Sequence, residues 1–153
     1  VMQTAVRLME TGVDLSVLIS RTLAARPVSA MKLWGLALAN LQHTGRVVWT
    51  AVSNDMRARA GEPADGESGL VSFIMGTPEA DVAAVFSETP QGAVEISLRA
   101  HPGFDVSQLA LELGGGGHPQ ASGCTLDGPL TAAQERVIPM LIALAAAGPT
   151  RNV

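Results

Sequence analysis

The clearest pattern of hydrophobic and polar positions lies between residues 93 and 100. Three apolar residues alternate there with three polar ones: Val94, Ile96 and Leu98 with Glu95, Ser97 and Arg99. Successive side chains of a β-strand point to opposite faces of its sheet, so this alternation predicts a strand. One face of the strand is expected to enter a core, and the other is expected to be polar and to end at Arg99.

Shorter patterns predict the remaining elements. Apolar and β-branched runs predict strands over residues 47–52, 81–88 and 124–126. Apolar residues at helical spacing predict helices within residues 3–41, over 54–60, from an N-cap at Asp105 to Leu113, and over 131–147. Residues 61–68 and 90–92 are turn formers, and residues 70–75 fit either a helix or a strand. This order predicts an α/β domain in which helices cover a central β-sheet, preceded by a helical connector.

The most informative segment reads Gly-Gly-Gly-Gly-His-Pro-Gln-Ala-Ser-Gly, over residues 114–123. Consecutive glycines lose much backbone freedom on folding, so a folded domain keeps them where side chains would be an obstruction. Their N–H groups can converge on an anion. Pro119 suits the first turn of a helix, whose N-terminus would favour phosphate beside His118. The candidate phosphate-binding residues are therefore Gly114, Gly115, Gly116, Gly117 and His118.

Two alternatives stay open for this segment. It could be a flexible glycine linker, although linkers usually contain serine and do not separate two periodic segments. It could also be a tight helix-to-strand turn, with His118 satisfied inside the core. Other nucleotide-binding loops fit poorly, because a P-loop requires a Gly-Lys pair and a dinucleotide fingerprint requires a third glycine where Pro119 stands.

Arg99 is the second candidate, because a guanidinium binds phosphate through two parallel hydrogen bonds. The alternative is an exposed surface arginine. His101 is expected in a turn, and His43 is expected to cap the C-terminus of a helix that starts at Ser29 and ends at Gly45. Three further residues are expected in the core: Trp34, Trp49 and Cys124.

Charge and composition limit the ligand and the location. The 153-residue chain has a net charge of −4, and its ten Lys and Arg residues are scattered. Proteins that coat long nucleic acids usually carry a basic stripe, so any nucleic-acid contact should be local and short. The two Trp, three Phe and absent Tyr disfavour an aromatic platform for bases. No secretory signal or membrane-length apolar run is visible, and one cysteine excludes an internal disulfide, so the expected location is cytoplasmic.

The sequence shows no catalytic metal site. Binuclear phosphoesterase sites need several Asp and His ligands close together. The aspartates are spread along the chain, without an Asp-x-Asp pattern: Asp14, Asp55, Asp65, Asp81, Asp105 and Asp127. No nucleophile with an adjacent base is recognised either. The chain is therefore expected to bind a substrate, and no catalytic residue or metal ligand is assigned to it.

The segment 114–123 closely resembles the glycine-rich motif of the DHHA1 domain of DHH/DHHA1 phosphoesterases. Residues 95–99 and 105–107 resemble the strand and helix start before that motif, and residues 67–71 resemble a further family segment. Residues 1–41 resemble the tail of the DHH domain and its connection to DHHA1. The resemblance implies a helical tail and connector over residues 1–45 and a DHHA1 substrate-binding domain over residues 46–153. The most similar subgroup is the NrnA type, oligoribonucleases that also act as pAp phosphatases.

The resemblance implies a two-domain enzyme that holds manganese in an N-terminal DHH domain and binds nucleotide through DHHA1. The Asp-His-His run of the DHH domain is absent from this sequence, so manganese is expected only in the full-length enzyme. Arg99, the loop 114–117 and His118 are carried over as substrate-binding residues. Ser72, Phe73 and Met75 depart from the residues usual in the family, so no base contact is carried over. The implied partners are a short oligoribonucleotide or nucleotide and the DHH domain of the same protein, without a membrane; a homodimer is left open.

Three functions follow from these observations. The preferred one is the substrate-binding portion of a manganese-dependent phosphoesterase for short oligoribonucleotides or pAp-like nucleotides. The alternative is a nucleic-acid or cyclic-dinucleotide binding module of a RecJ-like enzyme or a cyclic-dinucleotide phosphodiesterase, and a steep fall of affinity with salt would favour a long-strand clamp. The third is a structural or dimerisation module that binds no nucleotide.

Overall fold

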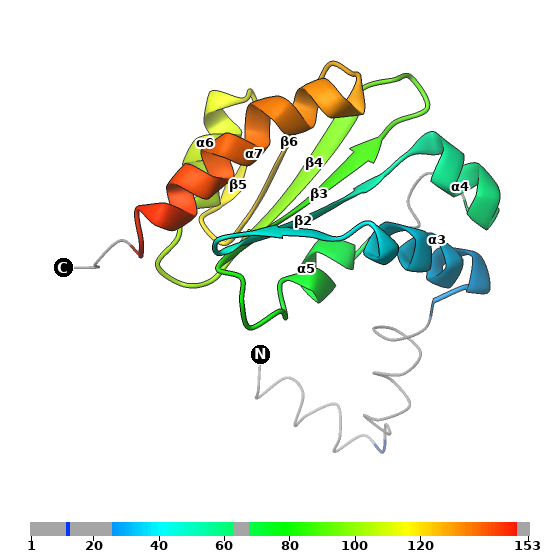
Figure 1. Ribbon diagram of the computed structural model, residues 1–153, viewed down its shortest axis with the longest axis horizontal. Helices are drawn as coiled ribbons and strands as arrows, with labels where there is room; N and C mark the ends of the chain where they lie inside the picture. Colours follow the sequence, from blue (N-terminus) through cyan, green and yellow to red (C-terminus); the bar gives the residue numbers. More distant parts are fainter. Residues whose placement is uncertain (1–11, 13–25, 63–67, 150–153) are drawn as a thin grey trace.

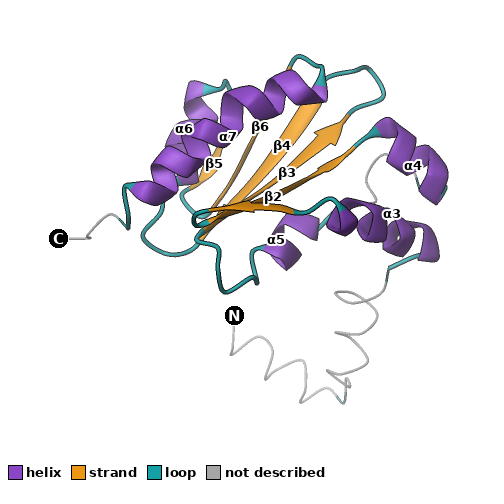
Figure 2. Cartoon of the chain, in the orientation of Figure 1, coloured by secondary structure: helices purple, strands orange, loops and turns teal. Residues whose placement is uncertain are grey.

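A computed structural model describes residues 12, 26–62 and 68–149 of the protein (Figure 1). Its strands form a six-stranded sheet in the order β1-β2-β3-β4-β6-β5. They are β1 (Gln42–Thr44), β2 (Val47–Val52), β3 (Val82–Glu88), β4 (Val94–Ala100), β5 (Gly116–His118) and β6 (Ala121–Leu126). β2 and β3 are parallel, and the other neighbouring pairs are antiparallel. The sheet is therefore mixed, as Figure 2 shows.

Helices lie on both faces of this sheet, which confirms the predicted α/β architecture (Figure 1). They are α3 (Val28–Ala39), α4 (Asn54–Ala60), α5 (Leu70–Ile74), α6 (Val106–Glu112) and α7 (Leu130–Ala146). The strands predicted over 47–52, 81–88 and 93–100 are confirmed to within one residue. The segment 70–75, which fitted either element, is the short helix α5. The helices expected before residue 26 and most of the loop 61–68 lie outside the described residues.

The first described helix ends earlier than expected. α3 stops at Ala39, and the side-chain amide of Asn40 donates to the carbonyl of Leu36 at 2.9 Å. This bond satisfies a carbonyl of the last turn, so the chain leaves the helix there. Gly45, with φ of 59°, lies in the β1–β2 turn, where a left-handed conformation suits glycine. The prediction that His43 caps a helix is wrong, because His43 belongs to β1.

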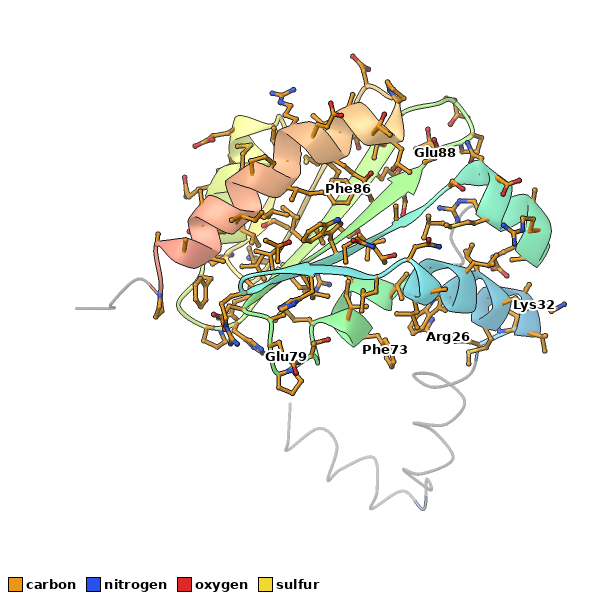
Figure 3. All side chains as sticks on the ribbon, viewed as in Figure 1. Arg26, Lys32, Phe73, Glu79, Phe86 and Glu88 are labelled. Atoms are coloured by element: carbon orange, nitrogen blue, oxygen red, sulfur yellow. The ribbon has the colours of Figure 1, made fainter. Side chains whose placement is uncertain are left out.

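The sheet separates two apolar cores. One lies between the sheet and helices α6 and α7, and it contains Phe86 and Leu98. The other lies between the sheet and helices α3, α4 and α5, and it contains Leu33 and Ile74. Figure 3 shows Phe86 in the interior below α7, whereas Phe73 lies on the outer side of α5 and is 60% exposed. Full burial of one large apolar side chain contributes about 1.5–3 kcal/mol, so both helix layers hold the sheet in place. The expected core positions are confirmed for Trp34, Trp49 and Cys124.

The helices α3, α4 and α5 cover only half of their face of the sheet. Ala83, Val85 and Ser87 of β3 point to this face and are buried. Beyond β3, residues of β4, β6 and β5 in register with them are exposed or half-buried. We call this uncovered surface the open half-face, and its residues are Glu95, Ser97, Arg99, Gly116, His118, Ala121, Gly123 and Thr125.

Candidate functional site

The glycine-rich segment forms a helix-to-strand turn followed by a hairpin. His118 is the last residue of β5, and Pro119 and Gln120 connect it to β6. The prediction that Pro119 begins a helix, with His118 at its N-terminus, is wrong. The carbonyls of Pro119 and Gln120 accept hydrogen bonds from Val106 N–H at 2.8 Å and Ala100 N–H at 3.2 Å. These bonds fix the hairpin tip to α6 and β4, so tertiary contacts select the hairpin over a new helical turn.

The four glycines do not form a free cradle of N–H groups. Gly114 N–H donates to Leu111 and Gly115 N–H donates to Ala110, at 3.0 and 2.8 Å, so both close the end of α6. Gly116 and Gly117 pair with β6. The expectation that consecutive glycine N–H groups converge on an anion is therefore wrong for Gly114 and Gly115. The helix-to-strand turn, the alternative left open, is the observed form, but His118 is exposed and does not lie in the core.

One row of the sheet brings Arg99 and His118 onto the same side. Arg99 pairs with Ala121 of β6, and Ala121 pairs with His118 of β5. Directly opposed residues of antiparallel strands place their side chains on one face. The backbones of Arg99 and His118 lie two strand spacings apart, roughly 10 Å. The small side chain of Ala121 separates them, so two long side chains can reach one group bound above it.

Arg99 is half-buried, and Nη1 of its guanidinium donates to the carbonyl of Leu98 at 3.1 Å. Its other N–H groups have no partner among residues 26–62 and 68–149. The His118 carbonyl accepts a hydrogen bond from Ser122 Oγ at 2.6 Å, which fixes the backbone while the imidazole stays exposed. Both side chains therefore keep donors for a ligand.

Two carboxylates stabilise the end of the sheet that carries Arg99. Asp81 accepts two hydrogen bonds from Arg46, at 2.7 and 2.9 Å, and this contact lowers the pKa of Asp81 and raises that of Arg46. Asp105 caps α6 by accepting from Ser107 N–H at 2.8 Å, and hydrogen bonds from Ser107 lower the pKa of Asp105. The predicted N-cap is thus confirmed. Arg46 is thus paired with Asp81, whereas Arg99 on the open half-face has no carboxylate partner among residues 26–62 and 68–149.

A depression of ≈ 380 Å³ lies at the opposite end of the open half-face. It was not predicted from the sequence, although the alternation had placed Glu95 and Ser97 on the polar face. The sequence does not show which half of this sheet face the helices leave uncovered, so the depression could not be predicted. The lining residues are Glu95, Ile96, Ser97, Gly114, Gly115, Gly123, Cys124 and Thr125.

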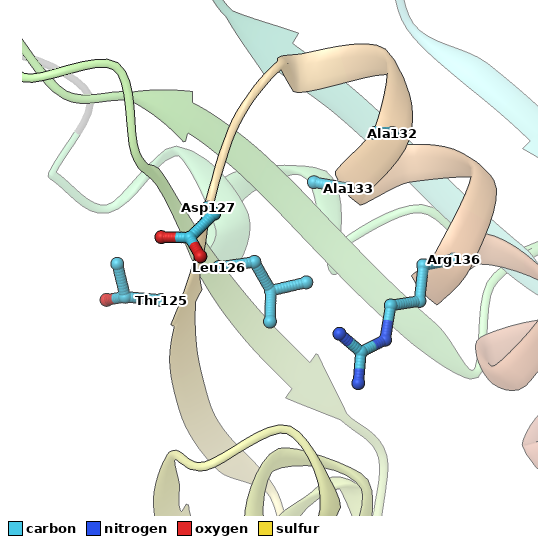
Figure 4. A pocket seen from close by; sticks show the side chains of 6 residues that line it. All are labelled: Thr125, Leu126, Asp127, Ala132, Ala133 and Arg136. Atoms are coloured by element: carbon cyan, nitrogen blue, oxygen red, sulfur yellow. The ribbon is translucent and has the colours of Figure 1, made fainter.

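A second depression, of ≈ 310 Å³, lies where β6 leads into α7 (Figure 4). Arg136 of α7 lines it together with Asp127 of the preceding loop. The depression is therefore lined by one acidic and one basic side chain. Nearby, burial raises the pKa of the Cys124 thiol, and Arg136 opposes this shift. Cys124 is a buried core residue, as the sequence predicted.

In residues 26–62 and 68–149, no three His, Cys, Asp or Glu side chains gather as a set of metal ligands. The described residues therefore do not fit a manganese site, which the resemblance implies for the DHH domain. Over the same ranges, every helix is too short or too polar to cross a membrane.

The chain matches the DHHA1 domain family over residues 56–146 and belongs to that family. It is 37% identical over 141 residues to the bifunctional oligoribonuclease and PAP phosphatase NrnA of Thermus thermophilus. This similarity covers 90% of the chain and 41% of the relative, so the chain spans about two fifths of the relative's length. The family and the NrnA-type similarity predicted from residues 114–123 are confirmed.

Solved structures share the fold. An exopolyphosphatase-related protein from Bacteroides fragilis has a TM-score of 0.84 and 20% identity, over 92% of this chain and 42% of that one. The pGpG-specific phosphodiesterase PggH from Vibrio cholerae has a TM-score of 0.55 and 13% identity, over 78% and 40% of the two chains. At these identities the likeness supports the fold alone.

Proposed function

We propose that this chain is the substrate-binding portion of a DHH-type phosphoesterase, and that it binds a short oligoribonucleotide or a pAp-like nucleotide on the open half-face. Arg99 and His118 bind one phosphate from opposite sides, above Ala121. The observation that carries the proposal is their shared row across β4, β6 and β5. The similarity to NrnA of Thermus thermophilus supports the class of substrate.

The surface favours a short ligand over a long strand. Arg99 is the only Lys or Arg on the open half-face, and the chain as a whole carries a charge of −4. Affinity for long nucleic acids depends on many neutralised phosphates. A surface with one arginine and one histidine instead suits a single phosphate, with neutral polar groups beside it.

In this proposal, hydrolysis needs a metal site that lies outside the described residues of this chain. Manganese, which would activate water for attack on phosphorus, would be held by a DHH domain of the same protein. The contribution of this chain is to bind and orient the phosphate. In this proposal the chain alone binds pAp and does not hydrolyse it.

Isothermal titration of the chain with pAp tests the proposal. Removing a charged hydrogen-bond donor costs about 1.5–3 kcal/mol, so Arg99→Ala is expected to weaken binding by about 10- to 100-fold. His118→Ala is expected to weaken it as well. Arg59→Ala is the matched control, because Arg59 lies on α4 and is 61% exposed beside Asp55. Unchanged affinity in both site variants, or an equal loss in the control, contradicts the proposal.

A companion assay separates binding from turnover. The chain is mixed with manganese and pAp, and released phosphate is measured. The chain is expected to release no phosphate at the rate of an enzyme. Release of phosphate at an enzyme-like rate would contradict the assignment of this chain to substrate binding alone.

A further inference from the structure

We propose that the depression at the Glu95 end of the open half-face binds a ribose, and that the Glu95 carboxylate accepts a hydrogen bond from its 2′-hydroxyl. This inference rests on the proposed function, because it assigns a sugar of the same ligand whose phosphate is bound by Arg99 and His118. It makes Glu95 a residue that selects ribonucleotides over deoxyribonucleotides.

The open half-face has opposite charge at its two ends. Arg99 and Glu95 point to the same side of β4 and lie four residues apart, roughly 14 Å along the strand. Arg99 and His118 mark one end, and Glu95 marks the other. A nucleotide has the matching asymmetry, with an anionic phosphate and a neutral sugar that carries hydroxyl donors. The charges therefore favour one orientation of the ligand.

The composition of the depression suits a sugar better than a second phosphate. Glu95 is the only charged residue among those that line it, and no Lys, Arg or His is present to bind an anion. Ser97 and Thr125 place hydroxyl groups on the same side of the sheet. Gly123 and Gly115 line the depression with backbone alone. The volume of ≈ 380 Å³ lies in the range of small-molecule sites.

The Glu95 carboxylate is available for this contact. It is exposed, and within residues 26–62 and 68–149 it forms no ion pair or side-chain hydrogen bond. An ionised carboxylate accepts hydrogen bonds and donates none. Dinucleotide-binding folds use the same chemistry, because an Asp or Glu there accepts from the ribose 2′-hydroxyl. A deoxyribose lacks this donor and leaves the carboxylate unpaired.

The test compares 5′-phosphorylated diadenylate with its deoxyribose counterpart by isothermal titration against the chain. The wild-type chain is expected to bind the ribonucleotide about 10-fold more tightly, as a charge-assisted hydrogen bond implies. Glu95→Gln is expected to reduce this preference, and Glu95→Ala is expected to abolish it. Glu135→Gln is the matched control, because Glu135 is exposed on α7. This variant is expected to keep the full preference for the ribonucleotide.

The outcomes separate this inference from the proposed function. If neither dinucleotide binds, or if Arg99→Ala leaves both affinities unchanged, the proposed function fails. If binding depends on Arg99 but the wild-type chain binds both sugars equally, only the ribose assignment is overturned. The same holds if Glu95→Ala retains the full preference. Circular dichroism of each variant confirms that the fold is intact.

Discussion

Replacing Gly115 with alanine tests how the glycine-rich turn packs against the sheet. A Cβ at this position would collide with the carbonyl oxygen of Gly123 and would lie 2.6 Å from Cys124 Cα. Both are backbone atoms of β6, which lies between β4 and β5 and cannot move without shifting them. Overpacking a core usually costs about 1–3 kcal/mol, and contact with fixed backbone places this change at the upper end, about 3 kcal/mol. For a domain of this size, that corresponds to a fall in Tm of about 6–12 °C.

Gly116→Ala is the matched control, because a Cβ there meets nothing within 4 Å. Its φ is not in the left-handed region, so alanine should leave stability within about 0.5 kcal/mol and Tm within about 2 °C. Thermal unfolding followed by circular dichroism measures both variants under identical conditions. Equal Tm values for the two variants, or a larger fall for Gly116→Ala, would refute the packing described here.

Further predictions concern the core and the cap. Phe86→Ala removes a side chain that is fully buried below α7 and is expected to lower the free energy of unfolding by about 3–5 kcal/mol in urea denaturation. Asp105→Ala removes the α6 N-cap and is expected to cost about 1 kcal/mol at neutral pH by the same method. The pKa of Asp105 is lower in the folded state, so its stabilisation is complete above the unfolded pKa and is lost as pH falls through the folded pKa. The difference between wild type and Asp105→Ala should therefore shrink on acidification, and a constant difference would contradict the assigned cap.

Local sequence patterns predicted the helices and strands whose formation depends on neighbouring residues in the chain. The alternation over 93–100 gave β4 with Arg99 on its polar face, because period-two burial follows directly from strand geometry. Asp105 gave the start of α6, because an aspartate N-cap needs only its own helix. The α/β class followed from the order of these elements.

The errors arose where distant segments decide the structure. Pro119 is compatible with the first turn of a helix and with a hairpin loop. The hairpin forms because its carbonyls accept N–H groups of Ala100 and Val106, and no local pattern reveals those partners. His43 was assigned to a helix end because the earlier stop at Asn40 depends on a side-chain bond to Leu36.

The layout of the proposed site could not be predicted from the sequence. Arg99 and His118 were singled out as phosphate ligands, but their shared row depends on β6 lying between β4 and β5. Strand order is a tertiary property. The role proposed for Glu95 depends in addition on α3, α4 and α5 covering the face only as far as β3, which the sequence pattern does not encode.

The most direct test of the central claim is an amide chemical-shift map of the chain titrated with pAp. Binding on the open half-face predicts that the largest changes fall on Arg99, Gly116, His118 and Gly123, with little change in α3 or β1. Changes centred on α3, α4 or α5 instead, or a spectrum unaltered by saturating pAp, would contradict nucleotide binding by this surface.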